Sequence, residues 1–369
     1  MRLDWLQNGF ISKDLYAPFK VKKDSDYYSD LKKRYNLLKV NAKTANADNE
    51  SISIIDSYTN RVLKALRHYY KGHISTTHSI IKKIVKETAV NRLALARLYS
   101  SDAFPGEKTK ELQFFRARIN NQAIPYEAKA MLHLPFNMRG KTGNYRFSLP
   151  GIPSLYLGNT SYACWLELGR PTEHDFVVSP VVLDGTQNIF NLVVSNREYY
   201  YLNDFEPDKV HCWLKLMILM IASSYVIEEE GRTFKSEYII SQSIMLACNE
   251  LGYDGVAYYS KRVEDQVFAQ AAINLALFSV YEYNKEYAKI CEHIKVGNSF
   301  NYSLFKQLGK ASANTTYELR CLRTGIINNI GSYERQYSYA DTDFCRFDKF
   351  LFSDWKKDDI DFGNAINKK

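Results

Sequence analysis

The 369-residue sequence lacks paired cysteines, so neither a disulfide framework nor a zinc-finger or redox motif is indicated. Isolated cysteines are among the most often buried residues, and they stay reduced in the cytoplasm. We therefore expect reduced core thiols, a cytoplasmic protein and no metal site. The six cysteines are Cys164, Cys212, Cys248, Cys291, Cys321 and Cys345.

A secretory signal and a membrane span are also missing from the sequence. The first ten residues mix Arg2 and Asp4 with polar side chains and contain no apolar core. The longest apolar run, residues 214–227, is interrupted by Lys215 and two serines. It is shorter than the roughly 20 residues that cross a bilayer, so we interpret it as a buried helix.

The residue patterns of a serine hydrolase are absent. No G-x-S-x-G sequence surrounds Ser260, and no sequence signal supplies a histidine base for it. Isolated histidines such as His174 and His211 are interpreted as structural. Ser260 is expected to act as a hydrogen-bonding contact at the end of a strand.

The overall composition is that of a globular protein, but the positive charge is unevenly distributed. The net charge is +8, and the first 110 residues contain 21 Lys+Arg against 11 Asp+Glu. Such asymmetry is compatible with a solvated surface, an acidic protein partner or nucleic acid. The dispersed lysines and the lack of a helix-turn-helix or zinc-finger signature favour a solvated surface.

Residues 1–110 are predicted to form a small, basic helical domain. Apolar residues recur at helical spacing over 51–70, and a second helix ends at Thr88. Residues 91–99 continue that helix or form a third one. Residues 100–110, SSDAFPGEKTK, have the composition of a linker.

Residues 111–119 open the second region as a strand. Arg116 and Arg118 share one face of this strand, and a pair of guanidinium groups is well suited to gripping a phosphate-bearing ligand. An exposed strand face is the alternative. Further strands are predicted over 176–184 and 188–194.

Residues 144–171, NYRFSLPGIPSLYLGNTSYACWLELGRP, predict a strand, a turn, a second strand and a helix. The alternation around Arg146 indicates the first strand, and residues 154–158 form the second. Asn159 or Thr160 caps a helix that ends near Gly169 and Pro171.

Glu167 is the most unusual residue of that predicted helix. Ala163, Leu166 and Glu167 are spaced so that the carboxylate lies on the stripe expected to face the core. A buried carboxylate needs partners, and the helix dipole opposes a negative charge near the C-terminal end. Stability alone would not select this residue. A Glu167 that faces solvent or pairs with Arg170 is the alternative.

The last third of the sequence is predicted to contain two helices, two strands and an extension. The extension, residues 281–369, begins with a predicted helix at 283–294 and continues with aromatic-rich sequence that is too apolar for a disordered tail. We expect it to pack on the core. The helices cover residues 208–229 and 235–251, and the strands cover 254–260 and 271–280.

In their order along the chain, these residues resemble the RES domain, a family named for its Arg, Glu and Ser. The family includes the toxins of bacterial RES–Xre toxin–antitoxin systems. The resemblance covers about residues 111–280. It rests on Phe115-Arg116, then Arg146, then P-G-I-P-S-L-Tyr156, then Glu167, then D-G-x-x-Y-Y-Ser260, and then Asn274.

This resemblance implies an α+β fold, with the split, strongly bent β-sheet and flanking helices of ADP-ribosyltransferases. It also implies three parts: the helical domain 1–110, a catalytic domain 111–280, and a mostly helical or irregular extension 281–369. NAD would be the substrate, with no metal.

The resemblance also implies roles for individual residues. Arg116 and Arg146 would grip the NAD phosphates, Tyr156 would line the nicotinamide pocket, and Glu167 would hold ribose hydroxyls and stabilise positive charge. The remaining cofactor-binding residues implied are Phe115, Arg118, Ser260 and Asn274.

The expected function is cleavage of the bond between nicotinamide and ribose, by hydrolysis or phosphorolysis, in a growth-arrest toxin or defence effector. An antitoxin or inhibitor protein would be a partner. Two alternatives remain open. One is an ADP-ribosyltransferase that binds a macromolecular target through its basic N-terminal domain. The other is a non-catalytic module that binds nucleic acid or protein.

Overall fold

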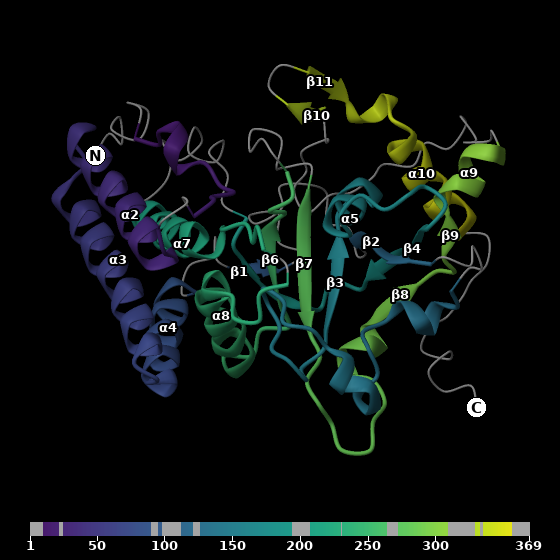
Figure 1. Ribbon diagram of the computed structural model, residues 1–369, viewed down its shortest axis with the longest axis horizontal. Coiled ribbons are helices and arrows are strands. Elements are labelled where there is room, and N and C mark those ends of the chain that lie inside the picture. The colour runs from purple at the N-terminus through teal and green to yellow at the C-terminus, as the bar shows by residue number, and fades with distance from the viewer. Residues whose placement is uncertain are drawn as a thin grey trace. The chain divides into compact units, whose positions relative to one another are not determined.

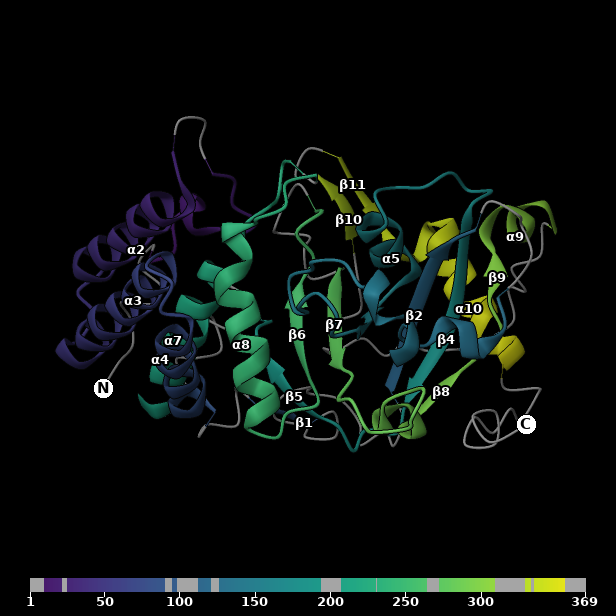
Figure 2. The same cartoon turned by 60° about the horizontal axis from the view of Figure 1, so that its bottom comes forward.

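A computed structural model shows an α+β protein whose chain divides into two compact units (Figures 1 and 2). Unit 1 contains residues 1–96, 145–147 and 190–261, and unit 2 contains residues 97–144, 148–189 and 262–369. Residues 190–261 thus cluster with the N-terminal helices, a different division from the three expected parts. The structure describes residues 10–21, 25–89, 95–97, 112–120, 126–193, 207–229, 231–263, 272–308, 329–332 and 335–355.

The N-terminal part of unit 1 is helical, as the sequence predicts. Helices α3 (Asn49–Tyr70) and α4 (Ile74–Thr88) pack as an antiparallel pair (Figures 1 and 2), with α2 (Tyr27–Thr44) beside α3. The Asp48 carboxylate accepts a hydrogen bond from the Ser51 amide and begins α3. A short 3-10 helix, η1 (Lys13–Leu15), comes before α2.

The rest of unit 1 supplies two apolar helices that pack against α3 and α4. They are α7 (Pro207–Ser223) and α8 (Ile239–Glu250), and nearly every residue of α7 is buried. The sequence predicts a buried helix over residues 214–227. This prediction is confirmed as far as Ser223, where α7 ends. The other elements are η5 (Ser236–Tyr238), β6 (Gly255–Tyr259) and two short strands whose residues are divided between the units along the chain, β1 (Leu95–Arg97) and β5 (Asn188–Asn191).

Unit 2 is built on an antiparallel sheet with the strand order β7-β3-β2-β4-β8, and β9 also pairs with β4 (Figure 2). Phe115 of β2 lies opposite Gly158 of β3, which lies opposite Asn274 of β7. This register brings three distant segments together. The strands are β2 (Leu112–Ile119), β3 (Ser154–Gly158), β4 (Phe176–Leu183), β7 (Ile273–Phe278), β8 (Ile294–Val296) and β9 (Phe300–Asn301).

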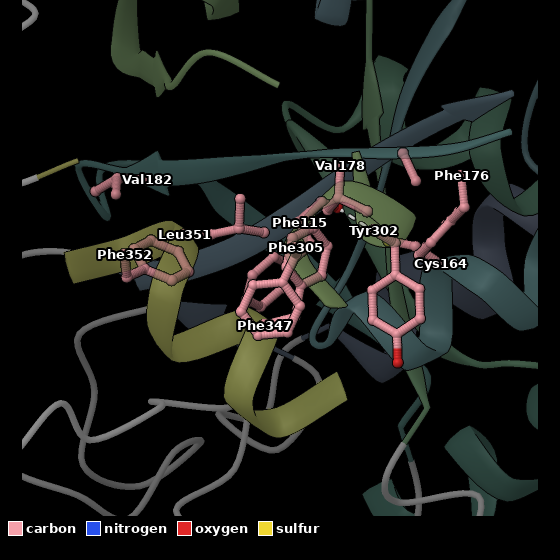
Figure 3. Packing of buried hydrophobic residues seen from close by; sticks show 11 residues of the cluster. Phe115, Cys164, Phe176, Val178, Val182, Tyr302, Phe305, Phe347, Leu351 and Phe352 are labelled. Atoms are coloured by element: carbon pink, nitrogen blue, oxygen red, sulfur yellow. Dashed lines mark hydrogen bonds between the residues drawn. The ribbon is translucent and has the colours of Figure 1, made fainter. Parts of the chain in front are cut away.

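The C-terminal helices cover one face of this sheet, as expected for a packed extension. Phe347, Leu351 and Phe352 of α10 (Asp343–Trp355) contact the β2 and β4 side chains Phe115 and Val178 (Figure 3). The remaining elements of unit 2 are α5 (Ser161–Glu167), α9 (Tyr302–Leu308), the β10–β11 hairpin (Asn329–Ser332 and Arg335–Ser338), and the 3-10 helices η2 (Ala128–Met131), η3 (Phe136–Lys141), η7 (Lys289–His293) and η8 (Tyr339–Asp341).

Three secondary-structure predictions are wrong. Residues 146 and 147 form a turn between two isolated bridge residues rather than a continuous strand, and the Arg146 guanidinium there donates to the carbonyls of Ser223 and Tyr225. The helix predicted at 283–294 is interrupted by the left-handed Asn284 and is replaced by η7 and β8. Residues 95–97 form the short strand β1, not a helix. The predicted linker 100–110 lies outside the described residues.

Candidate functional site

Helix α5 carries the predicted catalytic Glu167, and its position on β3 is fixed at its first turn. The Thr160 hydroxyl accepts a 2.9 Å hydrogen bond from the Ala163 amide, the N-cap that the sequence predicts. Gly158 allows the helix to approach closely, since a Cβ there would lie 2.8 Å from Cys164 Sγ and 3.1 Å from the Thr160 carbonyl oxygen. Any other residue at position 158 would push α5 away from the strand.

The register between β3 and β7 brings a partner to Glu167. The Asn159 amide donates to the Ile273 carbonyl at 2.9 Å, and Asn159 Oδ1 accepts from the Ile273 amide at 3.0 Å. The next residue, Asn274, is buried and donates from Nδ2 to Glu167 Oε1 at 2.6 Å. Glu167 and Asn274 are 107 positions apart, so only the folded sheet places them in contact.

The Glu167 carboxylate is half-buried at the C-terminal end of α5, where the helix dipole opposes its charge. Leu168 follows it, and the positive φ angles of Gly169 and Arg170 end the helix. The prediction of a partnered, inward-facing acid is confirmed by the contact with Asn274.

Arg116 lies in the same region of unit 2 as Glu167. Burial raises the pKa of the Cys164 thiol to about 12, while the nearby Arg116 charge lowers it and the Glu167 charge raises it. Both charges therefore act on the same side chain, one turn before the end of α5. The raised pKa keeps Cys164 protonated, so it is unsuited to act as a nucleophile.

Arg116 and Tyr156 are also in contact. Arg116 donates from Nη1 to the Tyr156 carbonyl at 2.8 Å, and the Tyr156 hydroxyl donates to Ser148 Oγ at 3.1 Å. The half-buried Arg116 and Arg118 share one face of β2, as predicted. Unit 2 thus contains two contacting pairs of predicted site residues, Arg116 with Tyr156 and Glu167 with Asn274.

Arg118 is held by a neighbouring loop. It donates from Nη2 to the Leu132 carbonyl at 3.1 Å, and burial lowers the pKa of its guanidinium. In the same loop, His133 Nε2 accepts from the Ala288 amide at 3.0 Å, and burial lowers the pKa of the imidazole. His133 is therefore neutral and ties the loop to residues 286–288. This residue has no role in the sequence-based prediction.

The structure places Arg146 in unit 1, and not in unit 2 with Arg116 and Glu167. Arg146 belongs to unit 1 and is 8% exposed, and its two terminal nitrogens donate to the carbonyls of Ser223 and Tyr225. The guanidinium also lies over the Tyr238 ring. Arg146 therefore caps the C-terminal end of α7 with two of its N–H donors, and its role in gripping phosphate stays a prediction.

Two further predicted ligand contacts are buried. The Phe115 ring is fully buried against Phe352 in the core cluster (Figure 3), so the prediction that it contacts a cofactor is wrong for the side chain. Its carbonyl instead accepts a hydrogen bond from the Cys164 thiol. Ser260 is 1% exposed and belongs to unit 1, where it follows β6.

One further residue, Asp348, was not predicted from the sequence. This α10 side chain is completely buried, and it accepts hydrogen bonds from the Ser161 amide at the start of α5 and from the Tyr339 hydroxyl. Burial raises the pKa of Asp348 to about 7. In sequence, Asp348 looks like an ordinary charged residue on an amphipathic helix, so no local signal could reveal its contact with α5.

A metal cluster and a membrane-spanning helix are both absent from the part of the chain that the structure describes. There, no group of three or more His, Cys, Asp and Glu side chains is arranged to hold a metal ion. Nor does any helix in those residues combine the length and hydropathy that crossing a bilayer requires. Within the same residues, five of the six cysteines are free and buried, as predicted, and Cys321 lies outside.

Comparison with known proteins gives one informative similarity. No family model matches the chain, and no solved structure matches it. The chain is 27% identical over 243 residues to the Bacillus subtilis (strain 168) protein named "Putative toxin YopC". The alignment covers 59% of this chain and 51% of that protein, so the chain spans about half the length of the curated relative it matches. The RES resemblance stays a prediction.

Proposed function

We propose that this protein is an enzyme that breaks the bond between nicotinamide and ribose in NAD, and that it acts as a growth-arrest toxin. The similarity to a protein named as a toxin supports the biological role. The order of residues shared with RES domains supports the substrate. Unit 2 would hold the reacting end of NAD near Glu167, within the ADP-ribosyltransferase-like architecture that the resemblance implies.

The contact between Glu167 and Asn274 is the observation that carries this proposal. A half-buried carboxylate placed against the helix dipole costs stability, and here it is oriented by a buried amide at 2.6 Å. An amide orients the acid and leaves its negative charge intact, as stabilisation of a developing cation requires.

The chemistry needs one carboxylate. When the bond between ribose C1′ and the nicotinamide nitrogen breaks, its electron pair moves to the ring nitrogen, and nicotinamide leaves as a neutral molecule. The ribose carbon becomes positively charged, as in glycoside hydrolysis, and Glu167 would stabilise this charge. A water or phosphate oxygen then bonds to C1′, and attacking water loses a proton. No general acid is needed for the leaving group.

Arg116 and Tyr156 would bind the rest of the substrate. Arg116 donates one hydrogen bond to the Tyr156 carbonyl, and this bond holds the guanidinium in place beside β3. A guanidinium fixed in this way is suited to a phosphate. The Tyr156 ring is half-buried, and its hydroxyl donates a hydrogen bond to Ser148, so the orientation of the ring is fixed.

Nicotinamide release from NAD by the purified chain, with and without phosphate, tests the proposal. Glu167→Gln keeps the shape and removes the charge, and we expect the rate to fall by about 100- to 1,000-fold, as for loss of one electrostatic contact in an enzyme. Glu173→Gln is the matched control, because Glu173 is an exposed acid of the same unit that pairs with Lys306. It should leave the rate unchanged.

The outcomes separate the candidate functions. Release that survives Glu167→Gln would remove the assigned role of this residue. If the wild-type chain releases no nicotinamide, the NAD proposal is wrong. Label that passes from NAD to a protein or nucleic acid would instead identify an ADP-ribosyltransferase.

A further inference from the structure

Helix α10 holds α5 with two side chains that lie one turn apart. Asp348 is completely buried, and its carboxylate accepts a 3.1 Å hydrogen bond from the amide of Ser161, the first residue of α5. The Phe344 ring packs against Tyr162 and Trp165 of α5, with ring-centroid distances of 5.3 and 5.5 Å. Positions 344 and 348 share one helix face, so α10 presents both groups to α5 from the same side.

Helix α10 is anchored independently of α5, so it can serve as a support. Phe347 and Leu351 belong to the core cluster that packs on β2 and β4 (Figure 3). The second oxygen of the Asp348 carboxylate accepts a hydrogen bond from the hydroxyl of Tyr339, which is buried in η8. Both oxygens of Asp348 are therefore fixed in direction, one toward α5 and one toward η8.

Hydrogen bonds, and not an ion pair, are what Asp348 makes in the described part of the chain. The other ionisable side chains on which its charge acts are Cys164 of α5, Tyr302 of α9 and Cys345 of α10 itself. Burial raises the pKa of each of these three groups, so all are neutral near pH 7. The contact with α5 thus depends on an oxygen acceptor at position 348, in either protonation state.

A displacement at the start of α5 reaches Glu167 because the helix is short. Helix α5 has seven residues, and at 1.5 Å per residue its first and last residues lie about 9 Å apart along the axis. Two hydrogen-bonded turns move as one body. Asn274 belongs to β7 and does not move with them, so a shift of α5 changes the 2.6 Å bond between Asn274 and Glu167.

The contact from α10 adds to the local contacts that begin α5. Gly158 and the Thr160 cap come from the segment directly before the helix. Asp348 is 187 positions from Ser161, and it lies in the C-terminal extension, outside the segment that resembles a RES domain. A contact with the extension is therefore part of what fixes the helix that carries Glu167.

We propose that Asp348 is a positioning residue, which sets the place of Glu167 against Asn274 by holding the start of α5. The inference rests on the proposed function, because the reaction it serves is the one assigned to Glu167. Asp348 acts through α5 and is assigned no contact with NAD. The C-terminal extension would then take part in catalysis as the support of α5.

Steady-state kinetics of nicotinamide release by the full chain test this role. Asp348→Ala removes the acceptor, and kcat should fall by about 10- to 100-fold, as for displacement of a catalytic group by up to about 1 Å. KM should stay unchanged, because Arg116 and Tyr156 lie on β2 and β3. Asp348→Asn keeps an oxygen for the Ser161 amide and should retain most of the wild-type kcat.

Two further variants complete the kinetic series. Asp343→Ala is the matched control, since Asp343 is a partly exposed acid of α10 beside Arg346, and its kcat should equal that of wild type. Tyr339→Phe removes only the hydroxyl that orients Asp348, so it should lower kcat by less than Asp348→Ala does. It keeps the inference testable if Asp348→Ala does not fold, which circular dichroism checks.

The side-chain amide of Asn274 reports the position of Glu167 without NAD. Its proton in the short bond to Glu167 should give a low-field NMR signal, assigned by its loss in Asn274→Asp. We expect this signal to move to higher field in Asp348→Ala and to stay in place in Asp348→Asn.

Three results would overturn the inference: an unchanged kcat in Asp348→Ala, a loss in Asp348→Asn as large as that in Asp348→Ala, or an unmoved Asn274 signal in Asp348→Ala. The NMR result also separates this inference from the proposed function. A wild-type chain that releases no nicotinamide would refute the proposed function, while the Asn274 signal would still decide whether Asp348 positions Glu167.

Discussion

Each unit places a charged side chain at the end of a helix, a cation at a C-terminal end in unit 1 and an anion at an N-terminal end in unit 2. In unit 1, the Arg146 guanidinium donates to carbonyls at the C-terminal end of α7. In unit 2, the Asp348 carboxylate accepts from the amide at the N-terminal end of α5. Each charge lies where the helix dipole favours it, and each comes from a distant part of the chain.

Glu167 differs from both of these residues. It lies at the C-terminal end of α5, where a negative charge is unfavourable, and it accepts a hydrogen bond from the side-chain amide of Asn274. The positions of Arg146 and Asp348 can therefore be explained by the helix dipole, whereas the dipole disfavours the position of Glu167. The comparison separates structural charges from a candidate catalytic charge without reference to any relative.

The largest expected effect is on Arg146. Replacing it with Met leaves the Ser223 and Tyr225 carbonyls without their buried donors, at a cost of about 3 kcal/mol. Hydrogen exchange of residues 207–225 and the urea midpoint of unit 1 measure the loss. Arg146→Lys should recover only part of it, because lysine lacks the planar fork. If Arg146→Met instead abolished nicotinamide release at unchanged stability, Arg146 would be a ligand-binding residue after all.

The second effect is the pH dependence produced by Asp348. Because burial raises its pKa from 3.8 to about 7, the folded protein holds this proton more tightly than the unfolded chain does. Its contribution to stability is therefore fully present below about pH 4 and lost as the pH rises towards 7. Asp348→Asn removes the ionisation, so its stability relative to wild type should rise over this range by on the order of 3 kcal/mol.

Thermal unfolding of wild type and Asp348→Asn at pH 4, 5.5, 7 and 8 gives this difference directly. Asp343→Asn is the control, since Asp343 is an acid of the same helix that lies partly exposed beside Arg346. Parallel pH curves for wild type and Asp348→Asn would show that the Asp348 proton does not couple to folding.

A smaller effect is expected from Gly158→Ala. The new Cβ would meet Cys164 Sγ at 2.8 Å and force α5 away from β3, costing about 1 to 3 kcal/mol and lowering the rate of nicotinamide release. Gly140→Ala is the control, because nothing lies within 4 Å of a Cβ there. Adding Cys164→Ala should recover part of the loss by making room, and a failure to recover would place the clash elsewhere.

The smallest expected effect is on the stability of Glu167→Gln. Removing a charge that opposes the helix dipole should stabilise the protein by about 0.3 to 1 kcal/mol, even as catalysis is lost. Urea denaturation measures the change. A marked loss of stability would mean that Glu167 serves the fold, as Arg146 and Asp348 do.

Local patterns in the sequence predicted the parts of the fold that depend on neighbouring residues. Apolar spacing identified α3 and α4, and the Thr160 cap identified the start of α5. The same reasoning failed at residues 145–148, where turn chemistry and a long-range arginine contact override an alternating pattern. It failed again at 283–294, where one left-handed asparagine interrupts a helical period.

The sequence by itself determined which residues could carry the chemistry, because a glutamate on an apolar helical stripe and two arginines on one strand face are visible as spacing. Only the tertiary structure decided which of them are available. The β3–β7 register places Asn274 on Glu167, the α7 carbonyls occupy Arg146, and the core buries Phe115. Helical and strand periods extend over a few neighbouring residues, whereas hydrogen-bond partners more than 70 positions away are set by the packing of the whole unit.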